Sequence, residues 1–153
     1  MAKSSLWTAF RVPVQPTVAS TALLLLRLVA GSAFILHGWP KIQNPAGWMG
    51  PGSTIPGFFQ VLAAVSEFGG GIAWVLGILT PLASLGIAST MTVAVYMHMI
   101  VMKDPFVNLT GKSSYEPALV YLVIALALLA LGPGKLSADR ALFGERADTG
   151  IKL

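Results

Sequence analysis

Apolar residues along the chain fall into four long runs, separated by shorter stretches rich in polar residues, glycine and proline. The runs cover about residues 17–37, 57–79, 81–102 and 115–132. A helix needs about 20 residues to cross the roughly 30 Å of hydrocarbon in a bilayer, and each run comes near that length. The pattern therefore predicts an all-α integral membrane protein, a four-helix bundle of antiparallel transmembrane helices.

Prolines and glycines mark the predicted ends of these helices. Pro81 and Pro117 fall in the first turns of the third and fourth runs, where a missing N–H is tolerated. Only Thr80 and Pro81 join the second run to the third, so we expect a tight antiparallel hairpin there. The sequence GPG at 132–134 ends the fourth run.

A secretory signal peptide is an alternative interpretation of the first run. Its apolar core is too long for one, it contains Arg27, and no small-residue cleavage motif follows it. We therefore expect it to remain as a helix. The polar C-terminal stretch predicts a short interfacial helix capped at Ser137 and a loose tail. The chain is accordingly divided into an N-terminal cytoplasmic segment (1–16), a transmembrane domain (17–134) and a cytoplasmic tail (135–153).

Composition supports a membrane protein. Hydrophobic residues make up 55% of the chain and charged residues 10%, against about 25% charged in ordinary soluble domains. Cysteine is absent, which excludes disulfides, thiolate metal sites and thiol redox chemistry by this chain alone. No basic run or aromatic–basic pattern suggests a nucleic-acid partner. The expected surroundings are a lipid bilayer.

The distribution of basic residues predicts the orientation. Cytoplasmic loops of membrane proteins carry an excess of Lys and Arg. Six basic residues lie on the side shared by both termini, and three lie in the loops on the other side: Lys3, Arg11, Lys135, Arg140, Arg146 and Lys152 against Lys41, Lys103 and Lys112. We therefore expect both termini in the cytoplasm. Trp39, Trp48 and Tyr115 then suit the outer aromatic belt, and Trp7 the inner one.

Two charged residues lie inside the apolar runs. Arg27 and Glu67 each sit about ten residues into a run, and the two runs enter the membrane from opposite sides. Both residues should therefore lie near the midplane, where a pair is far cheaper than two separate charges. Gly70 and Gly71 beside Glu67 would allow close helix approach. We expect an Arg27–Glu67 pair, serving either as a lock on helix register or as the lining of a polar cavity.

A second polar group is predicted near the outer surface. His37 ends the first run, His98 lies near the end of the third, and Glu116 opens the fourth, with Lys41 and Tyr96 at similar depths. Two imidazoles and a carboxylate at one level suit either a metal site or proton-coupled quinone chemistry. Neither histidine belongs to a ligand-spaced motif, and a histidine at a helix end is more often an interfacial hydrogen-bonding residue. No metal ligand is therefore assigned.

Several motifs resemble the DoxX family of small bacterial four-helix membrane proteins. The matching features cover about residues 20–144, in the family's order: Arg27 and Gly31, His37-Gly38 with Lys41, Glu67 with Gly69 and Gly70, Gly77 with Thr80-Pro81, and Gly132–Gly134 with Ser137 and Asp139. The resemblance implies a multi-pass protein of the bacterial cytoplasmic (inner) membrane. Relatives are associated with thiosulfate:quinone oxidoreduction and with membrane oxidoreductase assemblies that handle thiol or oxidative stress. The thiosulfate-oxidising relatives work with a partner subunit.

The first functional hypothesis is a subunit of a quinone-linked membrane oxidoreductase without a redox cofactor of its own. No motif encodes a cofactor, and the expected one is quinone. The residues assigned to this chemistry are Arg27, Glu67, His37 and His98 as catalytic groups, and Tyr96, Lys41 and Glu116 as cofactor-binding groups.

Two alternatives remain open. A non-catalytic accessory subunit would use the loop 39–56 as a docking surface, because that loop is long for a helix connection. A small-molecule permease is the least favoured, since four helices without an internal repeat would have to oligomerise. In each case we expect a homo-oligomer or other membrane subunits as partners.

Overall fold

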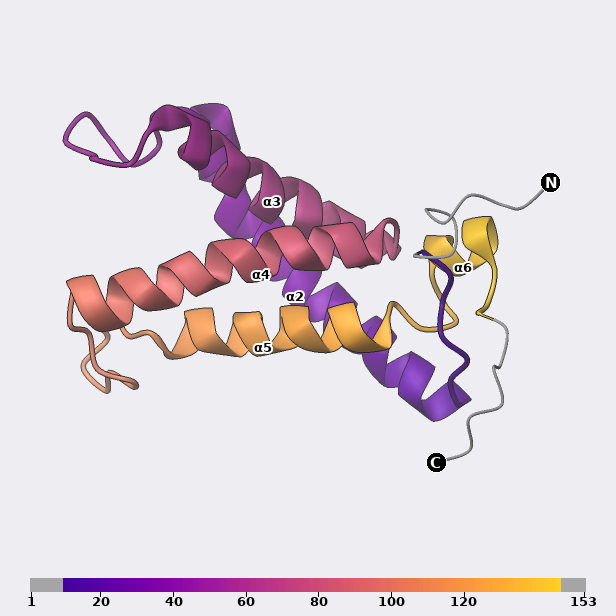
Figure 1. Ribbon diagram of the computed structural model, residues 1–153. Coiled ribbons are helices and arrows are strands. Elements are labelled where there is room, and N and C mark those ends of the chain that lie inside the picture. Colours follow the sequence, from indigo (N-terminus) through magenta and orange to yellow (C-terminus); the bar gives the residue numbers. More distant parts are fainter. Residues whose placement is uncertain (1–9, 147–153) are drawn as a thin grey trace.

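The computed structural model describes residues 10–146, and its named elements are all helices (Figure 1). The helices are α2 (Thr17–Gln43), α3 (Gly57–Leu76), α4 (Thr80–Tyr96), a π-helical continuation η1 (Met97–Val101), α5 (Glu116–Leu131) and α6 (Ala138–Phe143). Between residues 10 and 146, extended pairing is limited to one isolated bridge between Val12 and Glu145. The all-α prediction is confirmed. Lys3, Trp7 and the last part of the predicted tail (147–153, including Lys152) lie outside the described residues.

Three of these helices are long and apolar enough to cross a membrane. They are Thr17–Gln43, Gly57–Leu76 and the continuous α4–η1 segment Thr80–Val101. The fourth apolar helix, α5, has 16 residues, and at about 1.5 Å per residue it is shorter than the hydrocarbon core. All four lie close to the predicted apolar runs.

Helix α2 is longer than the sequence predicts. It ends at Gln43 rather than at His37, and it contains Pro40. A proline inside a helix removes one backbone hydrogen bond but does not always stop the helix. Here Pro40 lies at the start of the last turn, and α2 continues to Gln43 beyond it. The extension places Lys41 on the helix instead of in the following loop.

The helices form two hairpins that cross each other. α2 packs along α3, α4 packs along α5, α3 also contacts α4, and α2 and α5 touch only slightly (Figure 1). We name the two ends of the molecule by their connections. The turn end holds residues 77–79 and α6, and the loop end holds loops 44–56 and 102–115. Phe34, Trp74, Ile87 and Leu128 form the centre of the core.

Small residues bring α2 and α3 into backbone contact. A Cβ added at Gly38 would lie 2.5 Å from the backbone nitrogen of Phe68, and one added at Gly71 would lie 2.7 Å from that of Ile35. The predicted close approach beside Glu67 is therefore present. These contacts also set the register of the two helices, because they place Gly38 of α2 level with Phe68 of α3.

The turn end is closed by the segment that follows α5. Gly77 and Leu79, between α3 and α4, both have left-handed backbone angles, with φ of 65° and 47°. The predicted short helix is present as α6, and the Ser137 hydroxyl caps it by accepting the backbone N–H of Arg140 at 3.3 Å. The prediction of a Ser137 cap is confirmed.

Candidate functional site

Arg27 does not pair with Glu67, so that prediction is wrong. Its side chain is fully buried, and Nη2 donates to the backbone carbonyl of Leu136 at 2.6 Å. The reason is the displacement of the helices. Because Gly38 lies level with Phe68, residue 27 lies level with the C-terminal end of α3, where a side chain at Gly77 would overlap the Arg27 guanidinium.

Asp139 completes the structure around Arg27. Its two carboxylate oxygens accept the backbone N–H groups of Leu79 (2.6 Å) and Thr80 (2.9 Å) at the start of α4. Its own N–H donates to the carbonyl of Gly77 at 2.8 Å, and its charge attracts the Arg27 guanidinium. Arg27, Gly77, Leu136 and Asp139 together form what we term the clasp. The contacts of the clasp stabilise the fold, because each of them joins segments that lie far apart in the sequence.

Glu67 pairs instead with Lys41. The Lys41 ammonium lies 2.6 Å from each carboxylate oxygen of Glu67. The Glu67 side chain is almost fully buried, while that of Lys41 is 23% exposed. The ammonium also lies 4.5 Å from the centre of the Trp48 ring, within the range of a cation–π contact. The Lys41–Glu67 ion pair therefore lies on the loop-end side of the molecule, with the Trp48 ring against its ammonium group.

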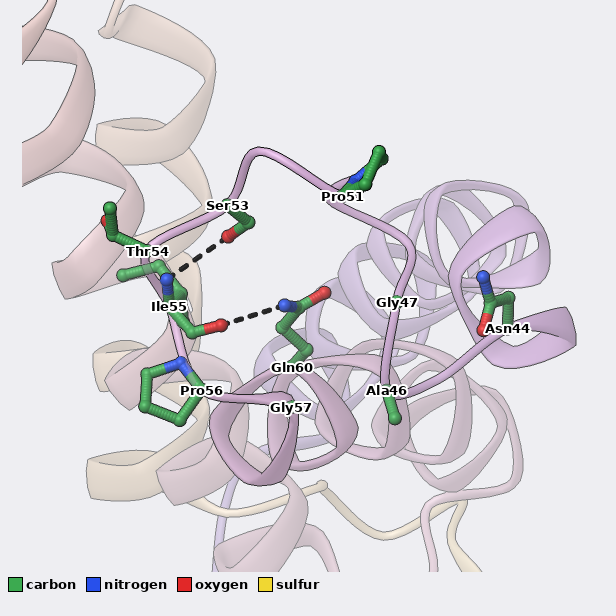
Figure 2. Close-up of a pocket in the computed structure, with 11 residues that line it drawn as sticks. Asn44, Ala46, Gly47, Pro51, Ser53, Thr54, Ile55, Pro56, Gly57 and Gln60 are labelled. Atoms are coloured by element: carbon green, nitrogen blue, oxygen red, sulfur yellow. Dashed lines mark hydrogen bonds between the residues drawn. The ribbon is translucent and has the colours of Figure 1, made fainter.

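Gln60 ties the loop 44–56 to helix α3. Its side-chain oxygen accepts the N–H of Met49 at 3.1 Å, its amide donates to the carbonyl of Ile55 at 2.8 Å, and its backbone carbonyl accepts the Trp48 indole N–H at 3.0 Å. Figure 2 shows the Gln60 side chain pointing into the pocket beneath the loop. This pocket has a volume of 580 Å³. This anchoring holds Trp48 over the ion pair.

His98 pairs with an aspartate on the following loop. Its Nδ1 lies 2.7 Å from Oδ2 of Asp104, and Oδ1 of the same carboxylate accepts the hydroxyl of Ser113 at 3.0 Å. The hydrogen bond from His98 lowers the pKa of Asp104 below its ordinary value, with a smaller contribution from Ser113. Asp104 therefore remains ionised at neutral pH beside the imidazole.

The predicted cluster of His37, His98 and Glu116 does not form, so that prediction is wrong. Among residues 10–146, no three His, Cys, Asp or Glu side chains come together as a metal-holding group. His37 is exposed and meets the Tyr121 ring edge-on, 6.3 Å between centroids. His98 belongs to the Asp104 pair. His37 therefore lies against α5, whereas His98 lines the groove between α3 and α4.

A groove between α3 and α4 brings three of the predicted site residues together. It has a volume of 860 Å³, and its ionisable lining residues are Lys41, Glu67 and His98. Most of its remaining lining is apolar, with Gly69 and Gly86 among the small residues. The size and the few polar groups are those of a ligand site. Arg27, His37, Tyr96 and Glu116 do not line it.

Sequence reasoning missed Gln60 and Asp104 as site residues. A glutamine inside an apolar run and an aspartate six residues after a histidine were the available signals. Asp139 belongs to a recognised motif, but its contacts with residues 77–80 depend on the fold.

Comparison with known proteins decides the family. The DoxX family model matches residues 22–100, which is more than half of the chain. The chain belongs to the DoxX family. It is also similar to the inner membrane protein YqjF of Escherichia coli (strain K12), with 29% identity over 122 residues, covering 78% of this chain and 91% of that protein. No solved structure matches it. This DoxX family member is a multi-pass protein of the bacterial inner membrane.

Proposed function

We propose that the chain is the quinone-binding subunit of a membrane oxidoreductase. The observation that carries the proposal is the groove between α3 and α4, which is lined by the Lys41–Glu67 ion pair. Side chains along its mouth, including Leu62, Val65 and Val93, are exposed on the apolar surface of the helices. In a membrane such a mouth opens sideways onto lipid, the phase in which quinones dissolve.

The polar residues of the groove suit a quinone head group. A quinone carbonyl needs hydrogen-bond donors, and an ammonium carries three N–H groups. Glu67 occupies two of those of Lys41, which leaves one for a ligand. His98, on η1, supplies a second donor from Nε2 when its imidazole carries both protons. A bound quinone would accept electrons and protons. The apolar walls would hold its tail and exclude water.

Other subunits are part of this proposal. The chain has no cysteine, so electrons reach the groove from a redox centre in a partner. We also propose that α5 spans the membrane with the other three helices as a four-helix bundle. Arg11, Lys135, Arg140 and Arg146 flank the turn end, which we place in the cytoplasm.

The test is quinone binding to protein purified in mild detergent. Gly69 lines the groove and has nothing within 4 Å of an added Cβ, so Gly69→Leu should fill the groove without disturbing the fold. Titration with a short-chain ubiquinone should quench the fluorescence of Trp48. We expect Gly69→Leu to weaken binding about tenfold or more, equivalent to about 1.4 kcal/mol.

Two control variants make the test specific. Ala130→Leu adds the same side chain on α5, at an exposed position outside the groove, and should bind like the wild type. Trp48→Phe separates quenching in the groove from quenching of the other tryptophans. Equal affinity in all the leucine variants, together with no co-purified quinone, would overturn the proposal.

A non-catalytic accessory subunit is the second candidate, and the clasp favours it. Arg27 and Asp139, two buried charged residues at the turn end, serve the fold itself. In that case the loop 44–56, held by Gln60, would be the docking surface. Native mass spectrometry of mild-detergent extracts should then show a hetero-oligomer without bound quinone.

A further inference from the structure

His98 lies where the helical geometry of the third span changes. Residues 97–101 form a π-helix at the end of α4, a distortion that is found frequently at functional sites. The next residues turn sharply, since Lys103 has a left-handed φ of 57° although it is not glycine. The altered backbone places His98 on the wall of the groove and Asp104 beside its ring.

Three contacts fix the orientation of the imidazole. Asp104 holds Nδ1, Ser113 holds the other oxygen of Asp104, and the N–H of Asp104 returns to the carbonyl of His98 at 2.8 Å. A carboxylate on Nδ1 favours the tautomer that carries its proton there. The second nitrogen, Nε2, is then the atom left for a ligand in the groove.

We propose that His98, with Asp104 as its positioning residue, exchanges protons between the groove and water at the loop end. This inference rests on the proposed function. Conversion of a quinone to a quinol takes up two electrons and two protons. A thiol reductant held by a partner supplies the electrons as two thiols become one disulfide, and their two protons go to solvent. His98 delivers protons one at a time: the imidazolium loses the proton on Nε2, becomes the neutral Nδ1–H tautomer held by Asp104, and takes up the next proton from water at Nε2.

The other ionisable residues of the groove are less suited to this exchange. Lys41 and Glu67 are bound to each other, and Glu67 is almost fully buried. The His98 side chain is 32% exposed and its partner Asp104 is 16% exposed. Asp104 also contacts Ser113, which is exposed on the loop. Of the three ionisable residues that line the groove, His98 therefore has the most exposed side chain.

The experiment is nitrogen NMR on protein labelled with ¹⁵N-histidine. The chain has two histidines, so His37→Asn assigns both sets of signals, and the exposed His37 serves as an internal control. We expect His98 to carry its proton on Nδ1. A short-chain ubiquinone should shift the Nε2 signal of His98 and leave the His37 signals in place.

Asp104→Asn tests the positioning role. It should convert His98 to a mixture of tautomers and reduce the ubiquinone-induced shift of the Nε2 signal, measured at saturating ubiquinone so that a change in affinity does not enter the comparison. Asp104→Glu should restore the Nδ1–H tautomer, which a merely structural defect would not allow.

The outcomes separate this inference from the proposed function. Absence of ubiquinone binding by fluorescence would overturn both. Binding with an unmoved Nε2 signal, or with the same tautomer in Asp104→Asn, would overturn the role of His98 and leave the quinone site intact.

Discussion

The basic side chains of Arg27 and Lys41 donate hydrogen bonds to different kinds of acceptor. Arg27 donates to a backbone carbonyl at the turn end, and Lys41 meets a carboxylate towards the loop end. Removing one member of a buried ion pair typically costs about 3–5 kcal/mol, since the other charge is left uncompensated. Each residue is therefore expected to matter for stability, but through separate partners.

A double-mutant cycle should distinguish these partners. Lys41→Gln and Glu67→Gln are expected to be non-additive, with a coupling of about 0.5–3 kcal/mol, as for residues in contact. Arg27→Gln and Glu67→Gln should be additive within about 0.5 kcal/mol. Thermal unfolding in detergent, read from intrinsic fluorescence, gives all the values. Coupling between Arg27 and Glu67 would contradict the structure.

The sequence correctly placed Arg27 and Glu67 inside helices, but it could not identify their partners. Counting residues from the ends of two apolar runs assumes that the helices begin level with each other. The glycine contacts set a different alignment, with Gly38 beside Phe68, and this depends on tertiary packing. Lys41 was predicted as a binding residue, yet its role as the partner of Glu67 required α2 to continue through Pro40.

At the scale of elements, the contact between α2 and α3 depends on the absence of side chains. Gly31 and Gly71 also face each other, since a Cβ at either would lie 2.8 Å from the carbonyl oxygen of the other. Interiors are packed too densely to absorb an added methyl group at such distances without movement of the backbone. The positions of the apolar runs predicted the helices themselves. The short distance between α2 and α3 was indicated in the sequence only by the glycines near Glu67.

Gly38→Ala should therefore destabilise the protein by about 1–3 kcal/mol, the usual cost of overpacking. Gly69→Ala on α3 is the matched control, because nothing lies within 4 Å of its added Cβ. That change should raise stability by about 0.5–1 kcal/mol, since alanine restricts the unfolded chain and favours helix. Midpoints of thermal unfolding provide the comparison. A destabilised Gly69→Ala variant with an unaffected Gly38→Ala variant would show that the two helices are not packed as described.

For the whole molecule, the clasp connects the first helix, the turn between the second and third, and the segment after the fourth. Asp139 satisfies two N–H groups at the start of α4, which would otherwise be unpaired helix-end donors. It also provides a negative charge near the buried Arg27. The residues of the clasp thus hold α2, the start of α4 and the C-terminal segment together at the turn end.

Asp139→Ala should lower stability by about 3 kcal/mol or more, because it removes a helix cap and leaves Arg27 uncompensated. Glu145→Ala is the control on the same segment. Its ion pair with Arg140 is 33–40% exposed, and such surface pairs contribute about 0–1 kcal/mol. Urea unfolding in mixed micelles measures both changes, and equal midpoints for the two variants would argue against the clasp.

The partner of Arg27 also has a consequence for biosynthesis. The carbonyl that accepts its hydrogen bond lies 109 residues further along the chain. At a translation rate of about 10 residues per second, that carbonyl emerges about 10 s after the arginine. During this interval the guanidinium must remain hydrated at the membrane surface or be shielded by the insertion machinery. We therefore expect Arg27 to reach its final buried position only when the C-terminal segment has been made.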